Sequence, residues 1–127
     1  MKGLTLTDVL GASIDKPTLP SLFISHGAPT IAIEDTPFTQ ALHQLGAALP
    51  KPKLIIIMSA HWESGEWLIN ANPAPSTLHD FGGFPKALFE IQYPAAGHTA
   101  AAQSIAKQLA QMQVAVKVVD NQPFDHG

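Results

Sequence analysis

The sequence predicts an α/β fold in which helices cover a largely parallel sheet. Residues 54–58 (LIIIM) are apolar throughout and three of them are β-branched, which is typical of a strand buried on both faces of a parallel sheet. A second short apolar run covers residues 22–24, and a helical pattern lies between the two runs. This order of strand, helix and strand predicts a β-α-β unit, whose crossover should be right-handed.

Composition favours a single folded domain and argues against several classes of function. With 127 residues, of which 46% are hydrophobic, the chain can bury a core. Its net charge of −3 and its lack of a basic run argue against binding of nucleic acid. The absence of cysteine excludes disulfides and thiolate metal sites. Because no apolar stretch approaches the ~18 residues of a membrane-spanning helix, we expect a cytoplasmic protein without a membrane partner.

The first half of the chain contains local signals for two strands and one helix. Residues 1–18 are predicted to form an N-terminal arm ahead of a domain that spans residues 19–127. The first strand is expected at residues 19–24. Thr36 is predicted to cap a helix of about three turns with Pro37 in its first position, because these residue types favour those positions. The helix should end before the next proline, which also precedes the second strand.

Two strands and two helical segments are predicted in the second half. Strands are expected at residues 67–70 and 114–119, because both are short apolar runs. Residues 98–113 are rich in alanine, with apolar residues at helical spacing, and predict the clearest helix. Residues 72–97 are rich in proline, glycine and aromatic residues, with one helical turn expected at residues 85–89. So long an irregular stretch inside a domain is usually functional.

Two histidines follow the predicted strands of the first half. His26 comes after residues 22–24 and His61 after residues 54–58, each behind one or two small residues. In open α/β sheets, ligands bind at the carboxyl ends of strands, so both imidazoles should project from one rim if the strands are neighbours. Imidazole is a common ligand for zinc and iron. However, the two residues are far apart in sequence and match no local ligand motif, so on spacing alone a hydrogen-bonded structural role is favoured over metal binding.

The other four histidines are weaker candidates. His43 is predicted to lie on the solvated side of a helix, and His98 at a helix start, where capping or exposure is favoured. Two further histidines stand beside a carboxylate within loops, in the pairs His79-Asp80 and Asp125-His126. Because adjacent residues need not touch, ordinary loop polarity is the favoured interpretation of both pairs. The chain has no Gly-x-Ser-x-Gly elbow and no phosphate-binding glycine loop, which argues against nucleophilic-serine enzymes and NTPases.

Five short motifs occur in one order along the chain and together resemble a known family. They are residues 25–29 (SHGAP), 59–62 (SAHW), 79–85 (HDFGGFP), 93–97 (YPAAG) and 125–127 (DHG). The set is similar to the DODA-type (4,5-DOPA dioxygenase-like) branch of the LigB-like, or class III, extradiol ring-cleaving dioxygenases. The resemblance runs from about residue 19 to residue 127, and SAHW and HDFGGFP are its specific parts. It implies a mixed, largely parallel sheet flanked by helices.

The resemblance also implies a metal site and a substrate pocket. His26 and His61 match two metal-ligand histidines, with one Fe(II) or Zn(II) ion per site. A catechol would chelate the ion, O2 would bind beside it, and the ring would open next to the two hydroxyls rather than between them. His126 matches a pocket histidine, which implies a catalytic and substrate-binding role. Phe81 and Phe84 would form an apolar wall against the ring, and ordinary loop packing is the alternative for both.

One departure from the family pattern concerns length. Family chains are about twice as long, and their remaining metal ligand and an acid/base histidine lie in the C-terminal half. We therefore expect a truncated sheet with an exposed strand edge. Three explanations stay open: the chain is a proteolytic or engineered fragment, a truncated gene product, or one member of a complex in which a second copy or a partner completes the sheet. The chain itself should be an incomplete, weakly active or inactive part of a dioxygenase. The alternatives are a non-catalytic metal- or partner-binding protein on the same scaffold, and a structural domain whose histidines bind nothing.

Overall fold

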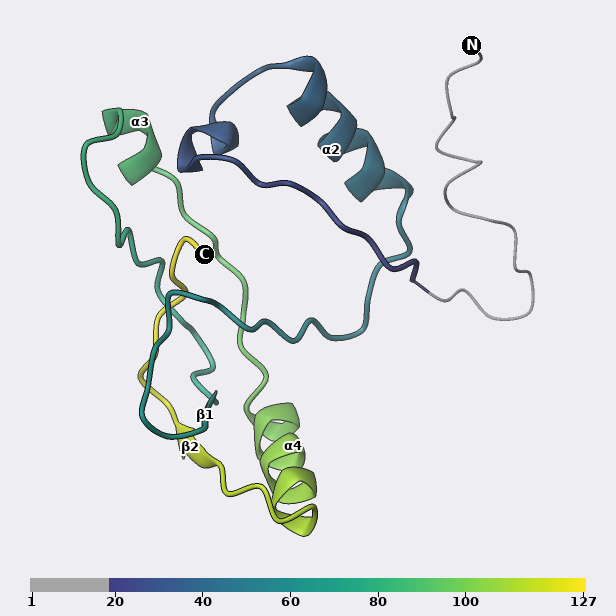
Figure 1. Ribbon diagram of the computed structural model, residues 1–127, viewed down its shortest axis with the longest axis vertical. Coiled ribbons are helices and arrows are strands. Elements are labelled where there is room, and N and C mark those ends of the chain that lie inside the picture. The colour runs from purple at the N-terminus through teal and green to yellow at the C-terminus, as the bar shows by residue number, and fades with distance from the viewer. Residues whose placement is uncertain (1–18) are drawn as a thin grey trace. The chain divides into compact units, whose positions relative to one another are not determined.

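The computed structural model describes residues 19–127, so the predicted N-terminal arm at residues 1–18 lies outside the described residues. The described chain forms two compact units, one ending at Ile56 and the other spanning Ile57–Gly127. Figure 1 labels the helices and strands of both units. The expected division into an arm and a single domain stays a prediction.

The first unit contains the 3-10 helix η1 (Pro29–Ala32) and the helix α2 (Pro37–Ala48). Thr36 caps α2: its hydroxyl oxygen accepts a hydrogen bond from the backbone N–H of Thr39 at 3.2 Å, while the hydroxyl oxygen of Thr39 accepts one from the N–H of Thr36 at 2.9 Å. This reciprocal capping box satisfies N–H groups that have no partner within the helix. The predicted start, length and end of this helix are confirmed.

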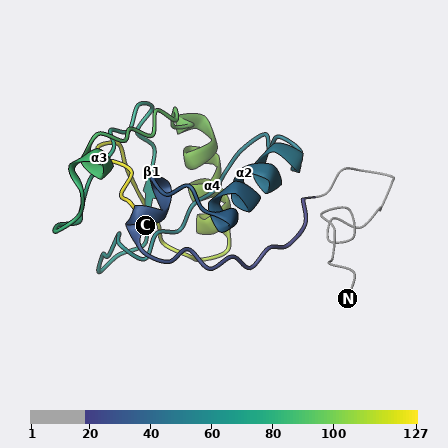
Figure 2. The ribbon, with the colours of Figure 1, turned by 90° about the horizontal axis from the view of Figure 1, so that it is seen from above.

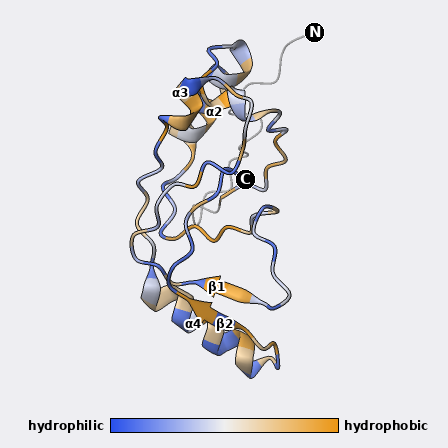
Figure 3. Ribbon diagram, turned by 90° about the vertical axis from the view of Figure 1, so that its left-hand side faces the viewer, coloured by the Kyte–Doolittle hydropathy of each residue, from blue (hydrophilic) through white to orange (hydrophobic). Residues whose placement is uncertain are grey.

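The second unit is built on a parallel strand pair with one helix packed on it. Strand β1 (Leu68–Asn70) pairs with strand β2 (Lys117–Val119), and Ile69 lies opposite Val118. Helix α4 (Thr99–Gln111) connects the strands and packs against both. Figure 3 shows apolar residues along both strands and a mixture of apolar and polar residues along α4. The helices and the small parallel sheet confirm the predicted α/β class.

The two helices of the second unit lie where the sequence predicts them. His98 caps α4, since its ring Nδ1 accepts a hydrogen bond from the backbone N–H of Ala101 at 3.1 Å. Ala102, one residue further on, is buried. The short helix α3 (Lys86–Phe89) confirms the predicted helical turn, and Figures 1 and 2 show α3 and α4 at separate ends of this unit. No helix within residues 19–127 is long and apolar enough to cross a membrane.

The two strands predicted for the first half of the chain are wrong. Within the described residues the sheet consists of β1 and β2 alone, and residues 19–24 and 54–58 pair with no other strand. Their side chains are exposed rather than buried, with Phe23 fully exposed and Met58 87% exposed. An apolar run becomes a strand only when a neighbouring strand binds its backbone N–H and C=O groups. The predicted β-α-β unit of the first half is therefore absent, whereas β1, α4 and β2 form one in the second half.

Candidate functional site

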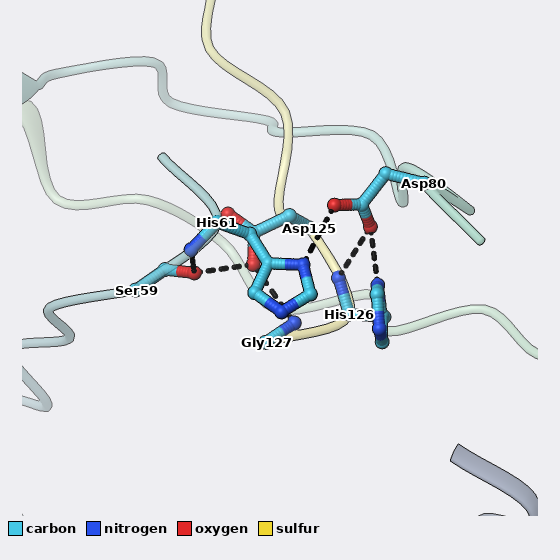
Figure 4. Close-up of polar contacts among 6 residues, drawn as sticks. All are labelled: Ser59, His61, Asp80, Asp125, His126 and Gly127. Carbon is cyan, nitrogen blue, oxygen red and sulfur yellow. Dashed lines mark hydrogen bonds and ion pairs between the residues drawn. The ribbon is translucent and has the colours of Figure 1, made fainter. Parts of the chain in front are cut away.

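Three side chains that can donate or accept protons meet within the second unit. The ring of His61 donates a hydrogen bond through Nδ1 to Oδ2 of Asp80 at 3.0 Å. The ring of His126 donates through Nδ1 to the other oxygen, Oδ1, at 2.5 Å, and the backbone N–H of His126 donates to the same Oδ1 at 3.1 Å. The two imidazoles lie edge to face, with ring centroids 4.3 Å apart. Figure 4 shows the carboxylate of Asp80 joined by dashed lines to both histidines.

Parallel alignment of two loop segments brings Asp80 close to His126. Beyond β1 and β2, an isolated parallel bridge joins Thr77 to Phe124. The N–H of Leu78 donates to the carbonyl oxygen of Phe124 at 2.6 Å, and the N–H of Phe124 donates to the carbonyl oxygen of the residue before Thr77 at 2.8 Å. Asp80 and His126 follow this bridge by three and two residues, so both emerge at the same place.

A second carboxylate, Asp125, fixes the backbone on which the histidines stand. Its Oδ1 accepts hydrogen bonds from the hydroxyl of Ser59 at 2.6 Å and from the N–H of Gly127 at 2.9 Å. The hydroxyl oxygen of Ser59 in turn accepts a hydrogen bond from the N–H of His61 at 3.1 Å. Ser59 therefore links the segment that carries His61 to the segment that carries His126, as Figure 4 shows.

Asp80 is held in its ionised form. The hydrogen bond from the ring of His126 holds the pKa of Asp80 well below its usual range and outweighs the opposing effect of desolvation. The backbone N–H of His126 and the ring of His61 lower the pKa of Asp80 further. An ionised carboxylate only accepts hydrogen bonds, so each ring donates to it through Nδ1. In a neutral ring, Nε2 then carries a lone pair that can accept a proton or bind a metal ion.

Aromatic side chains line one side of this cluster. The ring of Phe81 lies 4.9 Å from that of His126, centroid to centroid, and nearly perpendicular to it. Phe84 packs edge to face on Phe81 at 5.5 Å, and Phe89 lies 4.9 Å from Phe81. Phe81 is thus the aromatic residue that touches the cluster, and Phe84 supports Phe81. Their predicted role as a wall against a substrate ring stays a prediction, with the contact to His126 as its structural basis.

The other histidines lie outside this cluster. His79, next to Asp80, donates through Nε2 to the carbonyl oxygen of Ile91 at 2.8 Å, which is an ordinary loop hydrogen bond. His43 is exposed on α2, as predicted. His26 belongs to the first unit, where its ring lies 2.9 Å from the carbonyl oxygen of the next residue. Because His26 and His61 belong to different units, their predicted sharing of a metal ion stays a prediction.

Asp80 is the residue of this cluster that the sequence analysis missed. The signal in the sequence was its place in the motif HDFGGFP, where it stands directly after His79. Among the described residues, His61, Asp80 and His126 form a group whose potential ligand atoms lie within 4.8 Å of one another. Imidazole nitrogens suit a first-row divalent ion, and Nε2 of each ring is left for one because Nδ1 is bound to Asp80, so the histidines present fit the expected zinc or iron. The side chains are between 22% and 39% exposed, so solutes can reach them.

Comparison with known proteins assigns a family to most of the chain. The family described as "Catalytic LigB subunit of aromatic ring-opening dioxygenase" matches residues 20–127. The chain is 41% identical over 111 residues to "4,5-DOPA dioxygenase extradiol" of Escherichia coli (strain K12), a match that covers 86% of this chain and 40% of that protein. It is 38% identical over 93 residues to the protein of the same name from Beta vulgaris, covering 71% of this chain and 35% of the relative.

A further dioxygenase extends the set of relatives. "Dioxygenase tasH" of Hapsidospora irregularis is 29% identical over 120 residues, covering 85% of this chain and 37% of its own length. All three alignments leave more than half of the relative unmatched, so the chain spans about 40% of the length of the curated proteins that it resembles.

Proposed function

Because the chain belongs to the family of the catalytic LigB subunit of aromatic ring-opening dioxygenases, we propose that it takes part in the extradiol cleavage of a catechol by O2. The observation that supports this function most is the cluster of His61, Asp80 and His126, which places two imidazoles edge to face with both Nδ1 atoms bound to one carboxylate. The name of the relatives from Escherichia coli and Beta vulgaris supports an aromatic diol as the class of substrate.

We propose His26 and His61 as ligands of one Fe(II) or Zn(II) ion. In His61, Nε2 is the donor atom that remains once Nδ1 has bound Asp80. When bound, the ion would supply a template and a Lewis acid for the catechol and O2. Sites of this type generally use a third protein ligand besides two histidines. We propose only these two ligands from this chain, and therefore expect the 127-residue chain by itself to be weakly active or inactive.

His126 is proposed to bind the catechol and to move its proton. With Nδ1 donating to Asp80, Nε2 of His126 can accept the proton of a catechol hydroxyl and hold it during the reaction. Phe81, next to His126, offers an aromatic surface on which the catechol ring can pack, and Phe84 keeps Phe81 in place. These residues would bind and orient the substrate and keep water from one side of it.

Native mass spectrometry of the purified chain with added Zn(II) tests the metal site and the assembly state together. The wild-type chain is expected to carry one ion, and His61→Ala to lose it. His43→Ala, which changes an exposed histidine of α2, is the control and should keep the ion. A wild-type chain without metal, or an ion retained by His61→Ala, would contradict the proposed site.

A second candidate function is binding of metal or a partner without catalysis on the same scaffold. The exposed apolar run at residues 54–58 favours it, because Ile55, Ile56 and Met58 are 62%, 71% and 87% exposed. Apolar surface of this kind commonly marks an interface with another copy or another chain. Oxygen uptake with Fe(II) and a catechol distinguishes the two functions. A dimer or complex that binds the ion and takes up no oxygen would favour the second.

A further inference from the structure

We propose that Asp80 is a positioning residue whose two carboxylate oxygens set the orientation and the tautomer of His61 and His126 at the same time. This inference deepens the proposed function and rests on it for the roles of His61 in metal binding and of His126 in substrate binding. Asp80 touches neither substrate nor reacting atoms in this proposal. It acts through the rings, by keeping the proton of each on Nδ1 and leaving Nε2 of each for chemistry.

The geometry around the carboxylate supports this role. Oδ2 accepts from the ring of His61 at 3.0 Å, and Oδ1 accepts from the ring of His126 at 2.5 Å. Oδ1 also accepts from the backbone N–H of His126 at 3.1 Å, so the carboxylate is itself held by a group that cannot rotate away. Three hydrogen bonds thus define the plane of the carboxylate and, through it, the direction of both rings.

The chemical consequence follows from the two nitrogens of imidazole. A neutral ring carries one proton, and whichever nitrogen lacks it is the one that accepts a proton or binds a metal ion. A carboxylate partner on Nδ1 places the proton there and makes Nε2 more basic, which is the usual arrangement behind metal-binding histidines. Without Asp80, both rings would also populate the tautomer with the proton on Nε2, in which Nε2 is a donor and useless for either task.

A competing interpretation has Asp80 and the two Nδ1 atoms bind a cation directly. A first-row ion roughly 2.0–2.2 Å from each ligand keeps neighbouring ligand atoms about 3 Å apart. The separation of 2.5 Å between Oδ1 and Nδ1 of His126 is shorter than this, so the two atoms are placed as a hydrogen-bonded pair rather than as two ligands of one ion. The backbone N–H of His126 donates to the same oxygen, so Oδ1 already accepts two hydrogen bonds.

Long-range proton–nitrogen NMR of the metal-free chain tests the proposal without any activity measurement. At a pH where the rings are neutral, both histidines are expected to carry the proton on Nδ1. In Asp80→Ala both should shift toward the Nε2-protonated tautomer, and in Asp80→Asn, which keeps one acceptor oxygen, at least one ring should do so. Amide spectra of β1, β2 and α4 report whether each variant is folded.

Asp125→Asn is the matched control, because it removes a neighbouring carboxylate charge that bonds Ser59 and Gly127 but no imidazole ring. The tautomers of His61 and His126 should be unchanged in this variant. Folded Asp80→Ala and Asp80→Asn proteins with wild-type tautomers would overturn the proposal. A wild-type chain with the proton on Nε2 of either ring would overturn it equally.

Titration with Zn(II) separates this proposal from the proposed function. In Asp80→Ala the affinity is expected to fall roughly 10- to 100-fold, the usual effect of removing such a partner, and the nitrogen of His61 that shifts on binding should be Nε2. A shift of Nδ1 would show direct binding at the carboxylate side and overturn the positioning role. A wild-type chain that binds no zinc but shows the expected tautomers and their loss in Asp80→Ala would refute the proposed metal site and support the positioning of the rings.

Discussion

Two regions that look alike in the sequence hold their histidines in very different ways. Residues 22–26 and 54–61 are each an apolar run followed by one or two small residues and a histidine. In the second region the ring of His61 bonds Asp80, 19 residues away, and the hydroxyl of Ser59 bonds Asp125, 66 residues away. In the first region the ring of His26 has one hydrogen-bond partner among residues 19–127, the carbonyl oxygen of the next residue. The same local sequence pattern therefore predicts a site in both regions, whereas long-range hydrogen bonds fix the orientation of the histidine in the second region alone among the described residues.

The largest expected effect on the free energy of unfolding comes from disrupting the backbone packing of the unit that carries His61. A methyl group on Gly97 would overlap the carbonyl oxygen of Asn72, in the segment that leads to Asp80. Gly97→Ala should therefore lower the free energy of unfolding by about 3 kcal/mol, measured by urea denaturation. Gly46→Ala is the matched control in α2, where the methyl group meets no described atom within 4 Å beyond the backbone of its own helix. This change should raise the free energy of unfolding by roughly 0.5–1 kcal/mol. If Gly97→Ala and Gly46→Ala changed the free energy of unfolding equally, the two regions would not differ in packing as the structure indicates.

Removing each histidine in turn tests the comparison directly. In the metal-free protein, His61→Ala loses a charge-assisted hydrogen bond to a partly exposed carboxylate and should lower the free energy of unfolding by about 1–2 kcal/mol. His26→Ala should change it by less than about 0.5 kcal/mol, because the residue is exposed. Both variants should lose affinity for Zn(II) if the two residues bind one ion. Calorimetric titration measures that affinity, and wild-type binding by His26→Ala would remove His26 from the proposed ligands.

The smallest expected effect concerns the serines. Ser59→Ala removes the hydroxyl that joins the N–H of His61 to Asp125, and should lower the free energy of unfolding by about 1 kcal/mol. Ser25 occupies the corresponding place before His26, and its side chain makes no hydrogen bond with the described residues. Ser25→Ala should thus change the free energy of unfolding by less than about 0.5 kcal/mol. Thermal denaturation of both variants beside the wild type would show whether the hydroxyl of Ser59 stabilises the fold.

The helices could be predicted because their signals are local. The capping residue Thr36 with Pro37 after it, and the alanine-rich run after His98, each lie within a few positions of the structure that they specify. The strands β1 and β2 were also found, as short apolar runs. Residues 54–58 were the most apolar run of all and the prediction failed there, because strand formation depends on a neighbour that apolarity does not identify.

The candidate site was predicted in part for the same reason. His61, His126 and Phe81 were named from the motifs, and the structure brings these three residues together around Asp80. Asp80 itself was overlooked, since its bond to His126 spans 46 residues and depends on the parallel alignment of residues 77 and 124. The motifs identified the kinds of residue in the site, whereas the hydrogen bonds that join these residues depend on how distant segments of the chain align.

The long sequence separations within the cluster also constrain the order of folding. Closing contacts over 46 and 66 residues costs chain entropy that local elements do not have to overcome. The capped helix α4 can form early, and the parallel pair that it joins can follow once residue 119 is available. The cluster then assembles last, because its two carboxylates and two imidazoles meet only after residues 124–127 have aligned. During synthesis, a chain that has already folded around α4 would still carry His61 without its partners until residues 124–127 have left the ribosome.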